Sequence, residues 1–287
     1  MHTQGGEARL RLMPKEISEF TIGLVQMDIV AGDFDSNVSR AADHIGAAAR
    51  SGVEMVVLPE LWTSGYALDR AAELASVPGE GAFAAMQQLA LEKRLWVAGS
   101  ILEQENRRVY NTMIVCDPTG CLVATYRKTH LFGLMDEPRS LAAGDVPVML
   151  DLPFGRTGLA ICYDLRFPKL FAAYVSARCE AFLLCAEWPN PRLDHWRTLL
   201  RARAIESQAF VIACNRVGGS GTTFFGHSMI VDPWGDVVVE GDESEGVVVG
   251  RIDRTRLSDI RSRFPFLSDD RSFDVAETSR VPLENRC

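Results

Sequence analysis

Apolar residues along the chain occur in two alternating patterns. Residues 36–50 and 81–94 carry apolar side chains at helical spacing. Pro168 is placed to open a third helix through residue 177, and residues 193–209 predict a fourth. Short β-branched runs between the helices are typical of strands: TIGLVQM from Thr21, MVVLPE from Met55, WVAGSI from Trp96, MIVCD from Met113, then GLAIC, AFLLCAEW, FVIACN and SMIVDP. This alternation indicates an α/β fold.

The strands are apolar along most of their length, and this bears on how they are layered. The run FVIAC, for example, has no alternation of polar and apolar positions. Such strands are buried on both faces, as when helices cover one side of a sheet and a second layer covers the other. The pattern therefore favours a layered sandwich.

Two segments, residues 114–123 and 230–238, share one motif. Each has Ile-Val, then Asp-Pro-x-Gly, then a hydrophobic run ending in valine. Asp-Pro with glycine two positions after the proline suits a type I turn between two strands. Each segment predicts a hairpin, and the pair indicates two pseudo-symmetric halves.

No linker or low-complexity segment interrupts residues 21–252. We therefore expect one domain over residues 20–287, preceded by a flexible lead-in of residues 1–19. From about Asp253 the chain becomes polar and charged, with RSRFPF and RSF as its apolar anchors. This tail is too poor in core residues to fold alone, so we expect it to wrap its own subunit or to reach a neighbour.

Charge and composition limit the classes of partner that the protein could bind. The 287 residues carry a formal net charge of −8, with 47% hydrophobic and 24% charged residues, as in ordinary globular proteins. An acidic chain has no overall attraction to nucleic acid or to an anionic membrane surface. No apolar stretch is long enough for a membrane span or for the core of a signal peptide. We predict a cytoplasmic protein with no nucleic-acid or membrane partner.

The seven cysteines include no CxxC pair, and their number is odd. Cys116, Cys179, Cys185 and Cys214 lie in apolar segments, where reduced cysteine behaves as a small hydrophobe. Disulfides and a tetrahedral zinc site both need clusters that are absent here. We expect no metal and no cofactor.

Cys162 differs from the other cysteines in its surroundings. The segment GLAICYDLRFPKL runs from a strand into the cysteine, then into a polar turn and a helix opened by proline. A nucleophile on a strand-to-helix turn is accessible while its neighbours stay fixed, and backbone N–H groups there can point at an oxyanion. A buried core cysteine is the alternative, and it suits the other strand cysteines better.

Glu60 and Lys128 each lie at the end of a strand. Glu60, in VVLPELWTSGY, has aromatic and apolar neighbours, which would suit its carboxylate to accept and return a proton near neutral pH. Lys128, in TYRKTHLF, could stabilise negative charge on a substrate oxygen if its side chain turned inward. Taken singly, each residue could equally be a solvated surface charge with no catalytic role.

Histidine offers another choice of base. A Cys/His hydrolase could use His130, His195 or His227 with the same nucleophile. A lone histidine in such segments is more often structural, and His227 in GHS is interpreted that way.

Taken together, PELWTSGY, YRKTHLF and AICYDLRFP resemble the nitrilase superfamily of carbon–nitrogen hydrolases in order and spacing. The similarity extends from Gln26 to about Ile252. It implies a four-layer αββα sandwich and a catalytic triad of Glu60, Lys128 and Cys162. A second glutamate of the family maps to Glu137 in MDEPRSLAAGD, beside Asp136, and would be catalytic or would orient substrate or Lys128.

The residues after Cys162 indicate which branch of the superfamily the chain resembles. True nitrilases resemble one another in having Trp-Glu there, whereas this chain has Tyr163 and Asp164, which favours an amidase. AEWPNPRLDHWRTLLRARAIESQAFVIACNRVG and FFGHSMIVDPWGDV are most similar to the omega-amidase group, which hydrolyses 2-oxoglutaramate and related ω-amides. Such a substrate would need a cation for its far carboxylate, and four arginines are available: Arg166, Arg192, Arg197 and Arg216. The candidate substrate-binding residues are Tyr66, Tyr163, Glu187 and Trp188.

Besides the Cys/His hydrolase, two alternatives remain at this level. The substrate could be an aliphatic amide or an N-carbamoyl compound, or less readily a nitrile. A catalytically inactive scaffold or binding protein could retain the fold. The resemblance also implies a homodimer or a higher homo-oligomer.

Overall fold

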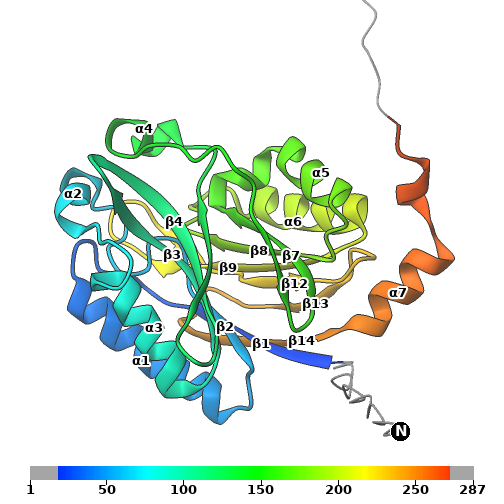
Figure 1. Cartoon of the computed structure of the whole chain (residues 1–287), viewed down its shortest axis with the longest axis horizontal. Helices are drawn as coiled ribbons and strands as arrows, with labels where there is room; N and C mark the ends of the chain where they lie inside the picture. The colour runs from blue at the N-terminus through cyan, green and yellow to red at the C-terminus, as the bar shows by residue number, and fades with distance from the viewer. Residues whose placement is uncertain (1–18, 272–287) are drawn as a thin grey trace, which may run out of the picture.

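The computed structural model describes residues 19–271, in which two β-sheets pack face to face between two layers of helices. Figure 1 shows helices α1 and α3 on the outer side of one sheet and α5 and α6 on the outer side of the other. The fold expected from the sequence, a four-layer αββα sandwich, is confirmed.

The first sheet has six strands in the order β14-β1-β2-β3-β4-β5. Strands β1, β2 and β3 run parallel, whereas β4, β5 and β14 each pair antiparallel to their neighbours. The strands are β1 (Glu19–Gln26), β2 (Met55–Val57), β3 (Trp96–Glu105), β4 (Arg108–Cys116), β5 (Leu122–Arg127) and β14 (Gly246–Asp253).

The second sheet repeats this arrangement in the order β13-β12-β9-β8-β7-β6. Its central strands β7, β8 and β9 are parallel, with an antiparallel hairpin on one side and a single antiparallel strand on the other. The strands are β6 (Met149–Leu152), β7 (Gly155–Ile161), β8 (Ala181–Ala186), β9 (Phe210–Asn215), β12 (Met229–Val231) and β13 (Val237–Glu240). Both hairpins predicted from the shared motif are present, as β4–β5 and β12–β13, and the prediction of two matching halves is confirmed. A short pair, β10 (Val217–Gly218) and β11 (Phe224–Phe225), lies outside the two sheets.

The four helices predicted from the sequence begin and end within two residues of the predicted bounds. Each buries one apolar face on its sheet, and in α1 the side chain of Asp33 accepts a hydrogen bond from the N–H of Ser36, which caps the first turn. These four helices are α1 (Phe34–Arg50), α3 (Gly81–Lys93), α5 (Pro168–Ser176) and α6 (Leu193–Ser207); the other described helices are η1 (Leu68–Arg70), α2 (Ala71–Leu74), η2 (Gly133–Met135), α4 (Glu137–Ser140), η3 (Cys162–Arg166), α7 (Arg254–Arg263) and η4 (Phe266–Asp269). Within residues 19–271, no helix combines the length and the apolar character needed to cross a membrane.

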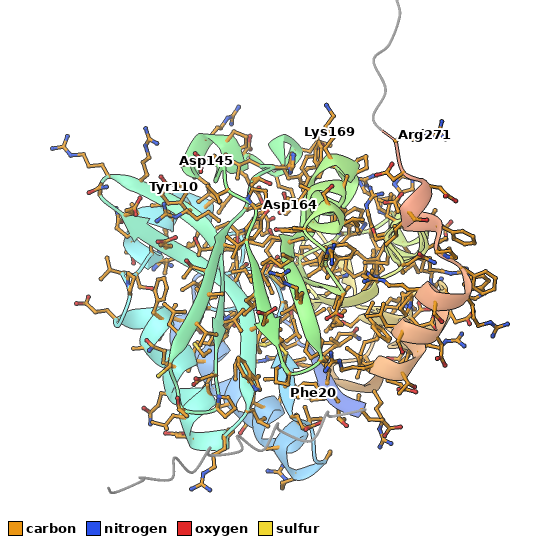
Figure 2. The ribbon with its side chains drawn as sticks, turned by 45° about the vertical axis from the view of Figure 1, so that its right-hand side comes forward. Phe20, Tyr110, Asp145, Asp164, Lys169 and Arg271 are labelled. Carbon is orange, nitrogen blue, oxygen red and sulfur yellow. The ribbon has the colours of Figure 1, made fainter. Side chains whose placement is uncertain are left out.

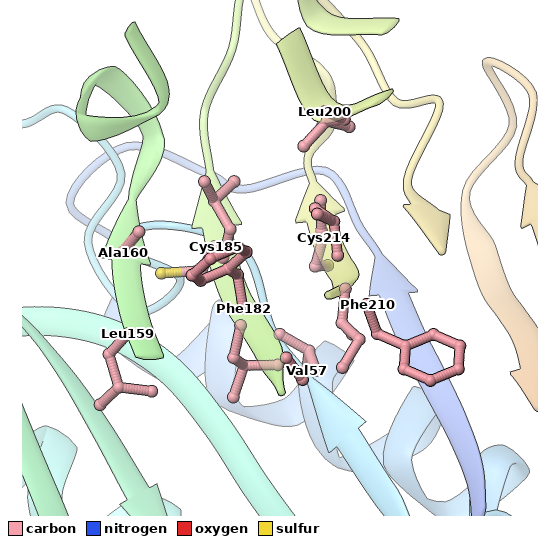
Figure 3. Close-up of a cluster of buried hydrophobic side chains, with 14 of the residues drawn as sticks. Val57, Leu159, Ala160, Phe182, Cys185, Leu200, Phe210 and Cys214 are labelled. Carbon is pink, nitrogen blue, oxygen red and sulfur yellow. The ribbon is translucent and has the colours of Figure 1, made fainter. Parts of the chain in front are cut away.

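The largest core lies between the sheets and under α5 and α6. Every residue of β8 and β9 is buried, which explains why these strands have no polar alternation. Figure 3 shows side chains of β7, β8 and β9 together with Val57 of β2 and Leu200 of α6. The inner strands are therefore covered on both faces, and their ends are held in fixed positions.

After β14 the chain packs on its own subunit as far as the structure describes it. Leu257 and Ile260 of α7 are buried, and Arg261 donates hydrogen bonds to the carbonyls of Gln208 (2.9 Å) and Cys179 (2.7 Å). This part of the tail agrees with the first of the two predicted roles. Most of the predicted lead-in, residues 1–18, and the last part of the tail, residues 272–287, lie outside the described residues, and Glu19 already belongs to β1.

A substitution in the layer between β8 and α5 tests this packing. Phe182 of β8 contacts the ring of Phe171 in α5, with centroids 4.9 Å apart. Phe182→Ala should lower the free energy of unfolding by about 3–5 kcal/mol, because it leaves a cavity in a fully buried layer. The measurement is urea denaturation followed by circular dichroism. Val123→Ala, at an exposed position of β5, is the control and should cost less than about 0.5 kcal/mol; equal losses for the two variants would contradict the packing described.

Candidate active site

Three predicted residues meet where strands of both sheets end. Glu60 lies three residues after β2, Lys128 directly follows β5, and Cys162 directly follows β7. β5 runs in the same direction as β2, so Glu60 and Lys128 lie at the same edge of their sheet. Glu60 and Lys128 are fully buried, and Cys162 is 4% exposed. The carboxyl ends of parallel strands are a common place for ligand sites in α/β folds.

The ammonium group of Lys128 lies between two carboxylates. Its Nζ is 2.7 Å from Oε1 of Glu60 and 2.6 Å from Oε1 of Glu137. Burial alone would lower the pKa of Lys128, but the two carboxylates outweigh it and hold that pKa well above its ordinary value. Lys128 is therefore a permanent buried cation in this site.

Glu60 is held from several directions. Oε1 also accepts a hydrogen bond from Nδ2 of Asn111 (2.8 Å), and Oε2 accepts one from the backbone N–H of Glu187 (2.9 Å). Asn111 contributes twice, because its backbone carbonyl accepts a hydrogen bond from the N–H of Lys128 at 2.8 Å. These contacts fix the carboxylate in one orientation. Asn111 lies inside a strand that is mostly apolar. The presence of an asparagine there was the only sign of this role in the sequence.

Glu137 opens α4 and reaches back to Lys128. Its Oε2 accepts the N–H of Phe132 (2.7 Å), and its Oε1 lies 2.5 Å from the hydroxyl of Tyr66. Burial raises the pKa of Glu137, and the charge of Lys128 opposes that rise. The neighbouring Asp136 is exposed and pairs with Arg139 of the same turn. Of the two acidic residues, the structure thus brings Glu137 to the site.

Cys162 is the first residue of η3, directly after β7, and its backbone is strained. Its φ of +44° lies in the left-handed region that side chains other than glycine avoid. Burial raises the pKa of the Cys162 thiol, and the charge of Glu60 raises it further, whereas Lys128 acts in the opposite direction. The raised pKa favours the protonated thiol, which would need a base in order to act as a nucleophile.

Asp164 ties the nucleophile turn to the loop that carries Lys128. One oxygen accepts hydrogen bonds from the N–H of Ile161 (3.0 Å) and from the hydroxyl of Tyr126 (2.7 Å). The other accepts the N–H of His130 at 3.0 Å. In Figure 2 Asp164 lies within the molecule, whereas Lys169, at the start of α5, points outward. The sequence marked Asp164 only as a guide to the branch and gave no sign of this positioning role, because its partners are distant along the chain.

The three candidate histidines have partners elsewhere. Nδ1 of His130 lies 2.8 Å from Asp164, and its ring stacks on Phe167 with centroids 3.8 Å apart. His195 is exposed beside Arg166, and His227 contacts Glu240. None of the hydrogen bonds or ion pairs within residues 19–271 joins these histidines directly to Glu60, Lys128, Glu137 or Cys162. The geometry favours glutamate over histidine as the base.

A small pocket opens beside Cys162. Its volume is about 10 Å³, close to the room that one water needs. Two of the predicted substrate-binding residues, Tyr163 and Trp188, line this pocket. Its full lining is Phe132, Cys162, Tyr163, Arg166, Trp188, Pro189 and Arg192.

The other two predicted substrate-binding residues lie behind the pocket. The hydroxyl of Tyr66 contacts Glu60 (3.1 Å) as well as Glu137, and the carboxylate of Glu187 is 2.8 Å from Nη1 of Arg216. Burial raises the pKa of Glu187 to about 7, although Arg216 opposes the shift. The hydroxyl of Tyr66 thus belongs to the Glu60–Lys128–Glu137 network, whereas the carboxylate of Glu187 pairs with Arg216, and neither residue lines the pocket.

The comparisons with known proteins agree with this geometry. Residues 21–262 match the family described as carbon–nitrogen hydrolase. The chain is 40% identical over 255 residues to a 2-oxoglutaramate amidase of Bacillus subtilis (strain 168), covering 88% of this chain and 98% of the relative. It is 33% identical over 278 residues to an omega-amidase of Homo sapiens, covering 93% and 100%. A solved CN-hydrolase superfamily structure from Xanthomonas campestris, with an arsenic adduct in its active site, is similar with a TM-score of 0.82 at 32% identity, covering 91% of this chain and 100% of that chain.

The charge around Cys162 gives a pH-dependent prediction. Because the pKa of its thiol is raised, alkylation of Cys162 by iodoacetamide should have its midpoint above about pH 8.5, the ordinary value for a cysteine. Glu60→Gln removes a negative charge beside the thiol and should shift the midpoint to lower pH. Peptide mass spectrometry over a pH series separates Cys162 from the exposed Cys121. Glu243→Gln, at an exposed position, should leave the midpoint in place; a wild-type midpoint below pH 7 would contradict the electrostatics.

Proposed function

The chain belongs to the carbon–nitrogen hydrolase family, and we propose that it hydrolyses the ω-amide of a small dicarboxylate through a thioester on Cys162. It is an enzyme that acts on a non-peptide amide. The observation that carries the residue assignment is the buried Glu60–Lys128–Glu137 network beside a cysteine on a strained strand-to-helix turn. The names of its relatives, 2-oxoglutaramate amidase and omega-amidase, support the ω-amide.

In the first half of the proposed reaction, Glu60 takes the proton of the Cys162 thiol while the sulfur attacks the amide carbon. The carbonyl oxygen becomes an oxyanion, which Lys128 and the backbone N–H of Tyr163 stabilise. Glu60 then gives its proton to the amide nitrogen, the carbon–nitrogen bond breaks, and ammonia leaves. The acyl group remains on sulfur as a thioester.

In the second half, water replaces the leaving group. Glu60 takes a proton from water, the resulting hydroxide attacks the thioester carbon, and the carbon–sulfur bond breaks. Glu60 returns the proton to the departing sulfur, so the free thiol is restored and the carboxylic acid is released. One amide and one water thus give one acid and one ammonia.

Glu137 acts in this scheme through Lys128. Its carboxylate is 2.6 Å from the ammonium and is held by the N–H of Phe132 and the hydroxyl of Tyr66. These contacts leave it to orient Lys128 and to balance its charge, a positioning role. A buried cation with one carboxylate removed would be left partly uncompensated, which is strongly unfavourable.

We also propose that the enzyme is a cytoplasmic homodimer. The dimer rests on the resemblance of the motifs to the nitrilase superfamily. The location is supported by the cysteines, since all six within residues 19–271 are free, as expected in a reducing compartment.

A substrate panel tests the proposed chemistry. Ammonia release from 2-oxoglutaramate should have a kcat/KM at least about tenfold above that for butyramide, an N-carbamoyl amino acid and a simple nitrile, because butyramide and the nitrile lack the distant carboxylate and the N-carbamoyl compound has a ureido group in place of the carboxamide. Cys162→Ala is the control and should lose about a thousandfold or more while keeping its circular dichroism spectrum. A higher kcat/KM for the carbamoyl compound or for butyramide would overturn the ω-amide, and absence of turnover on every substrate would favour an inactive scaffold.

A further inference from the structure

The four arginines that could meet a substrate carboxylate have different surroundings. Arg197 of α6 is paired with Glu240, with Nε and Oε1 2.6 Å apart. Arg216 is buried and paired with both Glu187 and Asp28, each at 2.8 Å. Both guanidinium groups are therefore neutralised within the protein, away from the residues that line the pocket.

The other two arginines line the pocket with Cys162. Arg166 lies over the ring of Trp188 at 4.6 Å, and its Nη2 is 3.3 Å from Nδ1 of His195. Arg192 lies 5.7 Å from the ring centroid of Phe132, and its guanidinium makes no hydrogen bond or ion pair with any residue of the range 19–271. Arg192 is thus the pocket cation whose hydrogen-bonding capacity is unused.

The backbone of Arg192 is held firmly although its side chain is not. Its carbonyl accepts hydrogen bonds from Nε1 of Trp188 (3.0 Å) and from the N–H of Trp196 (3.1 Å). Its own N–H donates to the carbonyl of Pro189 at 3.3 Å. The backbone therefore fixes the point on the pocket lining from which the side chain extends, and the guanidinium keeps its donors available for a ligand.

We propose that Arg192 is the residue that binds the far carboxylate of the substrate, with Arg166 remaining against Trp188 as part of the wall. This inference rests on the proposed function, since it assumes a monoamide of a dicarboxylate. A guanidinium presents paired N–H donors that match a carboxylate, and such charge-assisted pairs are stronger in a pocket that excludes water. Binding the carboxylate at Arg192 would direct the amide end of a short chain toward Cys162 on the same pocket.

The test compares two substrates that differ only at the far end. Succinamate carries a carboxylate where butyramide carries a methyl group, and both have the same amide and a chain of the same length. The readout is the preference, which is kcat/KM for succinamate divided by kcat/KM for butyramide. Arg192→Gln should reduce this preference about 10- to 100-fold, mainly through a higher KM for succinamate. Arg192→Lys keeps the charge but loses the fork of donors, so its preference should lie between those of the wild type and Arg192→Gln.

Arg197→Gln is the matched control, because it removes an arginine of the neighbouring helix that already has a carboxylate partner; it should leave the preference within about twofold of the wild type. A preference unchanged in Arg192→Gln, or lost only in Arg166→Gln, would overturn the assignment. Should wild-type enzyme show no preference for succinamate, the proposed function itself would fail, so the two failures are distinct. Inhibition by succinate gives a second readout in the same variants, and it should weaken in Arg192→Gln.

Discussion

The site depends on one buried positive charge. Lys128 has no exposed surface, and its ammonium is compensated only because Glu60 and Glu137 approach it from either side. Removing an ion from water is costly, and a buried pair is tolerated when its remaining hydrogen-bonding capacity is satisfied. The side chains and backbone groups that surround the two carboxylates meet this need, and the two packed sheets hold them there.

The same network decides how the cysteine behaves. Burial raises the pKa of the Cys162 thiol, the charge of Glu60 raises it further, and Lys128 opposes the rise, so the protonated thiol is favoured before a substrate arrives. In the proposed mechanism Glu60 then accepts the proton, and Lys128, whose pKa the two carboxylates raise against the effect of burial, stabilises the oxyanion. An exposed, permanently ionised thiolate would react with many electrophiles, whereas this arrangement couples activation of the nucleophile to the proton transfer.

Local sequence patterns were enough to predict the layers, four of the helices and both hairpins, because each depends on periodicity or turn chemistry within a short window. The resemblance then brought Glu60, Lys128 and Cys162 together, along with Glu137. It could not show that Tyr66 contacts Glu60 and Glu137, or that Glu187 pairs with Arg216, instead of lining the pocket. Nor could it show the supporting contacts of Asn111 and Asp164, whose partners Glu60 and Tyr126 are 51 and 38 residues away along the chain. Contacts between residues so far apart along the chain produce no local sequence pattern. For the same reason the sequence did not indicate which of the four arginines faces the pocket.

The central claim is that the reaction passes through Cys162. The most direct measurement is a rapid acid quench during the first turnover of 2-oxoglutaramate, followed by peptide mass spectrometry. The account expects a transient gain equal to the substrate less ammonia, confined to the peptide that contains Cys162. The same gain on another residue, or ammonia release with Cys162 unmodified at every time point, would contradict it.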